Sequence, residues 1–269
     1  ETLPLGNGLI GMMPDGNPTT ETIVLNEISM WSGSPEDPNN YDAHKNVSAI
    51  QALLKAGKND EAEKLVNETF VTKGKGSGFG NGANVPYGCY QLLGDLLLHH
   101  QLPSSAITDY TRSLDLTTAT AQTSFRAGDT KIQRTYYTSF DKNVGVIQLN
   151  QNSNARQAVG IAFERKENID RYTLLDDGIL VEGSLPDGKG GKKLIFVGLL
   201  KVQGKNLQVE RKDRVLEVSA QGNLSIYLTA TTSYYGQNPV AAAQATIAGV
   251  QSSNAAKIYR NHVNAYQKI

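Results

Sequence analysis

The sequence has little of what disulfides, membrane spans or polyanion binding require. Cysteine occurs once, at Cys89, so no disulfide can form within the chain, and a small half-buried thiol is the simplest interpretation of it. No run of about 18 apolar residues occurs, which predicts that no transmembrane helix is present. Lys plus Arg and Asp plus Glu number 26 each, so the formal net charge is zero. That balance argues against a nucleic-acid partner and fits a neutral polymer such as an oligosaccharide better.

Histidine is also scarce, with four in 269 residues. His99 and His100 are adjacent on a predicted strand, so their side chains should point to opposite faces of a sheet. No cysteine or carboxylate completes the spacing of a metal site around them. We therefore expect no bound metal and no cofactor.

From residue 92 onward, short stretches of alternating apolar and polar residues are separated by turn residues. About ten strands follow one another at hairpin spacing, without the crossover helices that a parallel sheet needs. The pattern predicts a mainly β protein built as a large antiparallel super-β-sandwich. Residues 1–41, rich in Gly, Pro and Asn, contribute one strand at residues 21–25, and residues 12–18 look turn-like.

Two segments have helical periodicity instead. Residues 43–70 predict an inserted helical hairpin, with Gly57 ending the first helix and Asp60 opening the second in a capping box with Glu63. Residues 236–269 predict a C-terminal helical linker, in which Asn238 caps the first helix. We therefore expect a sandwich domain over residues 1–235, followed by the linker.

The spacing G-x-G-x-x-G occurs at residues 6–11. A dinucleotide site would need a strand before this motif and a helix after it. Pro14, Gly16 and Pro18 follow instead, so no helix is expected there. The glycines are better explained as positions where the backbone turns tightly.

Glycoside hydrolysis uses two carboxylates that flank the sugar. Five acidic residues are candidates by their place in the pattern, but their spacing selects no pair, so the sequence chemistry alone shows no active site. The candidates are Glu27, Asp95, Asp109, Asp115 and Glu164.

Trp31 is the only tryptophan and lies in a predicted loop after Asn26 and Glu27. An indole face is a natural platform for a sugar ring, but a single tryptophan also serves as a packing anchor beneath a loop. The sequence leaves both interpretations open.

Several motifs occur in the order found in glycoside hydrolase family 95, and the sequence resembles the N-terminal part of that family over essentially its whole length. Leu92 departs from the pattern, because the family usually has a proline there. The motifs are residues 3–11 (LPLGNGLIG), 25–27 with 31–35 (LNE, WSGSP), 57–62, 90–96 (YQLLGDL), 110–116 (YTRSLDL), 230–234 (ATTSY), and His262 with Tyr266.

The resemblance implies a parent enzyme that hydrolyses α-L-fucosides, or α-L-galactosides in some relatives, with inversion. It also implies that the catalytic residues lie in an (α/α)6 barrel after residue 269, so this chain alone should be inactive. The chain's partner would be its own barrel domain, and fucosylated glycans would be bound through that barrel. A secreted or periplasmic parent protein is expected, with its signal peptide outside this sequence.

Two loops could reach the rim of the barrel's pocket: residues 26–35 and the glycine-rich residues 73–90. The rim candidates are Asn26, Glu27, Trp31, Tyr90 and Gln91. An autonomous carbohydrate-binding module is the alternative, and it predicts an exposed aromatic platform on one sheet face. A purely structural sandwich is a third reading, and it predicts a large exposed apolar patch.

Overall fold

The computed structural model describes residues 1–73, 88–251 and 255–269. They form two compact units. The larger one, called the β unit below, contains residues 1–31, 90–185 and 192–269. The small unit contains the described residues 32–73, 88–89 and 186–191.

The β unit is a large antiparallel sheet of thirteen strands within the described residues, curled into a sandwich. The super-β-sandwich predicted from alternation and turn residues is confirmed. The strands are β1 Leu5–Gly6, β2 Ile10–Pro14, β3 Thr20–Glu27, β4 Gly94–Gln101, β5 Ile107–Asp115, β6 Thr120–Ala127, β7 Thr130–Ser139, β8 Val144–Gln151, β9 Arg156–Glu164, β10 Ile169–Leu174, β11 Gly178–Pro186, β12 Lys192–Lys212 and β13 Val215–Thr232.

Two layers result because the longest strands, β12 and β13, belong to both. The first half of β13, from Val215 to Gln221, pairs with β9, and its second half, from Leu224 to Leu228, pairs with β8. β12 follows β13 along both halves, with register shifts around Lys205. The first layer therefore runs β1-β2-β3-β4-β9, and the second runs from β8 through β7 and β6 to β5, with β11 and β10 beyond β12.

The main core fills the space between the two layers. Every second residue of a strand faces this core. Buried positions therefore alternate with partly exposed ones along strands such as β3 and β4. Met12, Ile23 and Leu96 contribute from the first layer, and Ile147 and Ile226 contribute from the second.

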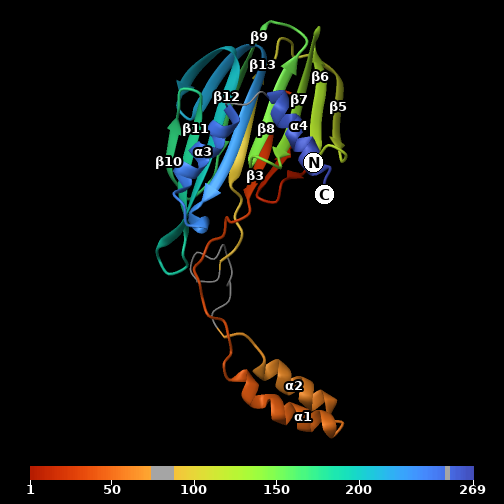
Figure 1. The fold of residues 1–269 in the computed structure, drawn as a ribbon, viewed down its shortest axis with the longest axis vertical. Helices are drawn as coiled ribbons and strands as arrows, with labels where there is room; N and C mark the ends of the chain where they lie inside the picture. Colours follow the sequence, from red (N-terminus) through yellow and green to blue (C-terminus); the bar gives the residue numbers. More distant parts are fainter. Residues whose placement is uncertain (74–87, 252–254) are drawn as a thin grey trace. The chain divides into compact units, whose positions relative to one another are not determined.

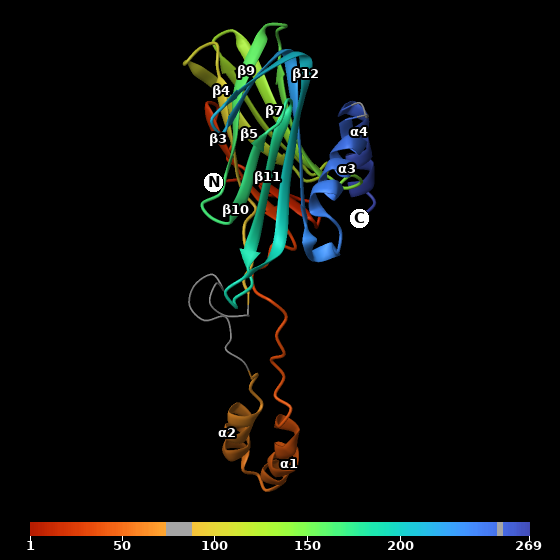
Figure 2. The same ribbon diagram turned by 90° about the vertical axis from the view of Figure 1, so that its left-hand side faces the viewer.

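Two C-terminal helices cover the outer face of the second layer: α3, Pro239–Gln251, and α4, Ala255–Tyr266. Their apolar residues pack with Tyr137 and Tyr227 in a second core. Figures 1 and 2 show both helices on the side opposite β3, β4 and β9. The Asn238 cap is confirmed, since its side-chain oxygen accepts from the amides of Val240 and Ala241 at 3.0 and 3.1 Å. The outer face of the first layer has no such helical cover among the described residues.

The small unit contains the predicted helical hairpin, formed by α1 (Val47–Lys55) and α2 (Asn59–Thr69) after a short 3-10 turn. Gly57 has φ +73°, as expected of a residue that ends a helix. The predicted capping box is wrong: α2 begins one residue earlier, after Lys58, whose side chain makes no cap bond. Asp60 and Glu61 lie in its first turn instead, where acidic side chains favour the positive end of the helix dipole.

The prediction of a turn over residues 12–18 is wrong in its first part. Met12, Met13 and Pro14 continue β2 and pair with β3 through Leu25, Val24 and Ile23. Proline is tolerated because it occupies the last position of the strand. The turn is confined to residues 15–19.

Gly94 lies at the start of β4, where it approaches the neighbouring strand closely. Its φ is +148°, and a Cβ added there would lie 2.6 Å from the carbonyl oxygen of Glu164. We expect Gly94→Ala to lower the free energy of unfolding by about 3 kcal/mol, because backbone must move to make room. Urea unfolding followed by circular dichroism measures the change.

Gly249→Ala is the matched control, since it lies within α3 and no described atom lies within 4 Å of a Cβ added there. Alanine in a helix interior should stabilise by about 0.5–1 kcal/mol. Equal stability of the two variants would contradict the proposed close approach at Gly94.

Candidate functional site

A row of two glycines and one asparagine crosses the outer face of the first layer. Gly6 of β1 is opposite Gly11 of β2, and Gly11 is opposite Asn26 of β3. Their neighbours Leu5 and Met12 point inward and are buried, so the row itself faces outward. Two adjacent glycines leave the backbone of the sheet uncovered at this point.

This bare strip is the floor of a hollow, called the glycine hollow below. Its volume is about 350 Å³, which lies in the range of small-molecule sites. No charged side chain of the described ranges lines it. The lining residues are Gly6, Gly8, Leu9, Ile10, Gly11, Asn26, Ile28, Trp31 and Tyr90.

The turn that joins β1 to β2 is held by Asn7. Its Oδ1 accepts hydrogen bonds from the amides of Leu9 and Ile10 at 3.0 and 2.8 Å, and its Nδ2 donates to the carbonyl of Ser139 at 2.9 Å. Gly8 follows with φ +88°, a conformation that glycine adopts without strain. An Asn-Gly turn between two strands explains the glycine-rich motif, and no helix follows it.

The wall of the glycine hollow is aromatic. Trp31 and Tyr90 form an isolated β-bridge, and their rings meet edge to face with centroids 5.8 Å apart. The Tyr90 hydroxyl donates to Asn26 Oδ1 at 3.0 Å, with the Glu27 carbonyl oxygen 3.3 Å away. Trp31 nevertheless remains 53% exposed and Ile28 52% exposed. Trp31 is therefore in ring contact with Tyr90 while about half of its surface stays open to solvent.

The structure thus brings together three of the five rim candidates: Asn26, Trp31 and Tyr90. Glu27 points to the other side of β3, where its carboxylate is buried and accepts from the amide and hydroxyl of Ser29 at 2.8 and 2.7 Å. Burial raises the pKa of Glu27, and these bonds oppose the shift. The Gln91 amide donates to the Met30 carbonyl at 2.7 Å, and Gln91 does not line the glycine hollow.

Sequence reasoning missed the contribution of Gly6, Gly11, Leu9 and Ile28. The signal was present in the motif at residues 6–11, but the register that aligns two of its glycines across strands is a property of pairing, which spacing alone does not define. Most of the glycine-rich stretch at residues 73–90, the second predicted rim loop, lies outside the described residues.

Two of the candidate carboxylates do meet. Asp95 of β4 lies directly opposite Glu164 of β9, so both point out of the same sheet face. Partial burial raises the pKa of Asp95, and the charge of Glu164 raises it further. Neither residue lines the glycine hollow. Asp109 and Asp115 lie on β5, and the Asp115 carboxylate accepts from the hydroxyls of Thr117 and Thr118.

Within the described part of the chain, no three His, Cys, Asp or Glu side chains lie close enough to hold a metal ion. The same residues include no helix long and apolar enough to cross a membrane. His99 and His100 do face opposite sides of β4, one exposed and the other buried.

The family model described as "Glycosyl hydrolase family 65, N-terminal domain" matches residues 1–237. The chain belongs to this family. The recognition of an N-terminal glycoside hydrolase domain from the sequence is therefore confirmed.

Curated relatives of this family 65 N-terminal domain are named as fucosidases. "Probable alpha-fucosidase A" of Aspergillus niger (strain ATCC MYA-4892 / CBS 513.88 / FGSC A1513) is 36% identical over 152 residues, which cover 56% of this chain and 18% of that protein. "Alpha-L-fucosidase 2" of Arabidopsis thaliana is 25% identical across 100% of this chain and 34% of its own length. The chain thus spans about a fifth to a third of the curated relatives it matches.

Among solved structures, "Putative kojibiose phosphorylase from human microbiome" superposes with a TM-score of 0.56 over 98% of this chain and 35% of that one. The identity is 9%, so this likeness shows a shared fold alone.

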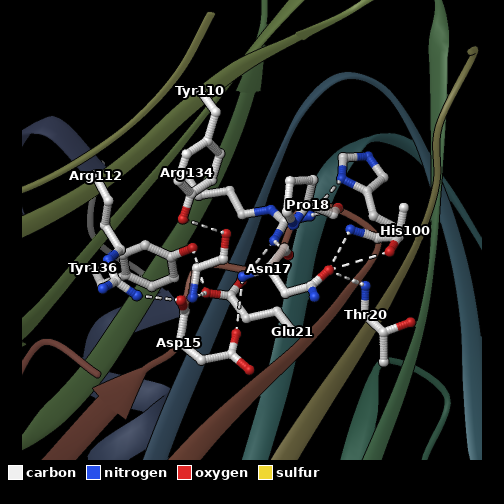
Figure 3. A network of polar contacts seen from close by, with 12 residues as sticks. Asp15, Asn17, Pro18, Thr20, Glu21, His100, Tyr110, Arg112, Arg134 and Tyr136 are labelled. Atoms are coloured by element: carbon white, nitrogen blue, oxygen red, sulfur yellow. Dashed lines mark hydrogen bonds and ion pairs between the residues drawn. The ribbon is translucent and has the colours of Figure 1, made fainter. Parts of the chain in front are cut away.

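The family 65 N-terminal domain also contains a cluster of buried ionisable side chains, which Figure 3 shows. Arg134 of β7 donates to Glu21 Oε2 at 2.8 Å and contacts His100 Nδ1 at 3.2 Å. Tyr136 donates to Glu21 Oε1 at 2.7 Å. The side chains of Arg134 and Glu21 are fully buried, so a substrate has no access to them.

This cluster holds the turn between β2 and β3. Arg134 also donates to the carbonyl oxygens of Asn17 and Pro18, and Glu21 accepts from the amide of Gly16 at 3.2 Å. The buried charges are thus paired and hydrogen-bonded, which is the condition under which a protein interior tolerates them. Their role is to tie a loop of the first layer to a strand of the second.

His100 makes the domain sensitive to acid. Burial, together with the charge of Arg134, lowers the pKa of His100 to about 3, whereas in the unfolded chain it lies near 6.5. Between these values the unfolded chain binds more protons than the folded one, so stability falls as the pH falls. We expect the titration of His100 to lower the free energy of unfolding by about 2 kcal/mol when the pH falls from 7 to 5.

Urea unfolding at several pH values measures this dependence. The asparagine in His100→Asn has an oxygen that can accept a hydrogen bond from Arg134, and its side chain does not titrate. The free energy of unfolding of this variant should therefore vary less with pH. Burial also lowers the pKa of His262, so part of the dependence remains. His99→Asn, at the exposed neighbouring position, should leave the dependence unchanged. Identical pH profiles for all three proteins would contradict the assignment to His100.

Proposed function

We propose that this chain is the N-terminal accessory domain of an α-L-fucosidase-like enzyme of glycoside hydrolase family 95. Its partner is then the catalytic barrel of the same protein, and its location is secreted or periplasmic. Membership of a glycosyl hydrolase N-terminal domain family supports the accessory role, and relatives named as α-fucosidases support the fucosidase-like activity. The assignment to family 95, in place of the family 65 of the matching model, rests on the sequence motifs. The order of the motifs at residues 3–11, 90–96 and 110–116 agrees with it.

One observation supports the proposal that this chain alone does not hydrolyse glycosides. Among the candidate carboxylates only Asp95 and Glu164 meet, and neither lines the glycine hollow. A glycosidase needs its acid and its base or nucleophile on either side of a bound sugar, roughly 5–9.5 Å apart. Two carboxylates side by side on one sheet face do not enclose a sugar in this way.

The test compares the 269-residue chain with the full-length protein. Release of fucose from an aryl α-L-fucoside and from 2′-fucosyllactose should be detectable for the full-length protein and absent for the chain alone. Circular dichroism and cooperative urea unfolding confirm that the chain is folded when it is assayed.

Asp95→Asn and Glu164→Gln in the full-length protein serve as controls, and both should retain activity within about twofold, since neither side chain reaches the reacting bond. Turnover by the purified chain that either substitution abolishes would place catalysis in this domain. An active full-length protein that cleaves only other glycosides would reject the fucosidase assignment and leave the accessory role intact.

A further inference from the structure

We propose that the glycine hollow is a binding subsite for a single neutral pyranose ring, with a 6-deoxy sugar such as an α-L-fucosyl group as its preferred occupant. The sugar class rests on the proposed function. The place and the kind of ligand rest on the hollow itself.

The floor of the hollow is the first argument. Glycine in a strand interior weakens a sheet and often marks a place where a ligand approaches the backbone closely. Here two glycines, Gly6 and Gly11, lie opposite one another and both face outward. A Cβ at Gly6 would meet nothing nearer than the Ile10 carbonyl at 3.7 Å, so the fold itself does not demand glycine there. Because Gly6 has no side chain, the hollow stays open.

The wall is the second argument. Trp31 is about half exposed, and its ring meets the Tyr90 ring edge to face with the centroids 5.8 Å apart. The C–H face of a pyranose is apolar and packs on such a surface, whereas its hydroxyls need hydrogen-bonding groups at the side. Asn26 supplies these: its Oδ1 accepts from Tyr90, which orients the amide, and its Nδ2 makes no hydrogen bond within the described residues.

The charge and polarity of the lining residues limit the class of ligand that the hollow can bind. Among the residues that the structure describes, no charged side chain lines the hollow, which favours a neutral ligand over a phosphate, a carboxylate or an ammonium group. Leu9 and Ile28 form an apolar, exposed border. A methyl group packs against such a border more favourably than a hydroxymethyl group, which would leave a hydroxyl without a partner. A 6-deoxy sugar is therefore preferred over its 6-hydroxy counterpart.

The single tryptophan makes the test direct, because fluorescence excited at the indole reports on Trp31 alone. The 269-residue chain is titrated with methyl α-L-fucopyranoside, methyl α-L-galactopyranoside and 2′-fucosyllactose across the millimolar range, where single-ring affinities usually lie. We expect a saturable change with the fucosides, and a several-fold weaker affinity for the galactoside, which differs by one hydroxyl.

Gly6→Ile is the decisive variant. Isoleucine suits a strand, so the thermal midpoint should be unchanged or raised, while its side chain fills the hollow and weakens binding by about tenfold or more. Leu116→Ala is the matched control: Leu116 is exposed and does not line the hollow, so affinity should be unchanged. Trp31→Ala, followed by ligand-observed NMR because it lacks the fluorophore, should also lose binding and covers the case in which Gly6→Ile fails to fold.

Absence of a saturable signal with every sugar would overturn the subsite, as would full affinity in folded Gly6→Ile and in Trp31→Ala. Concentration-dependent self-association that Trp31→Ala removes, without sugar binding, would reassign the surface to protein contact. These outcomes are independent of hydrolysis by the full-length protein. Fucose release without binding by the chain rejects the subsite only, and binding without fucose release rejects only the fucosidase assignment.

Discussion

The continuous pairing of β12 with β13 is the interaction on which the rest of the β unit depends. Because β13 pairs with β9 along its first half and with β8 along its second, one strand joins the two layers. Register shifts in the hairpin around Lys205 accompany the change of partner. The two layers can then face one another and bury a single core, with Leu216 and Ile226 of the same strand contributing from either half.

This arrangement leaves the two outer faces with different environments. The second layer is covered by α3 and α4, so residues such as Val146 and Tyr227 are buried on its outer side as well. The outer face of the first layer carries small, polar and apolar residues that are partly exposed, such as Gly11, Asp95 and Val24, with the aromatic pair Trp31 and Tyr90 at one end. A ligand surface on this domain is therefore favoured on the first layer. Buried polar bonds at Glu21 and Arg134 hold that layer to the second without using its outer face.

The glycine-rich motif at residues 6–11 shows how one pattern can suit different structures. Between a strand and a helix such glycines cradle a phosphate. Between two strands, with Asn7 holding the turn, they instead expose a strip of sheet backbone. The structural context decides the chemistry, and here it favours a neutral, ring-shaped ligand over an anion.

Local sequence patterns were enough to predict the fold class, the helical hairpin, the capped C-terminal helix and the family resemblance, because alternation, turn residues and capping residues act over a few neighbouring positions. They also placed Asn26, Trp31 and Tyr90 in one set of candidates. The folded structure was needed to show that Glu27 turns inward, that Asp95 faces Glu164, and that Gly6, Gly11 and Asn26 form one row. These depend on strand register and on which face each strand buries. Register is set by pairing between residues far apart in the chain, so local spacing does not contain it.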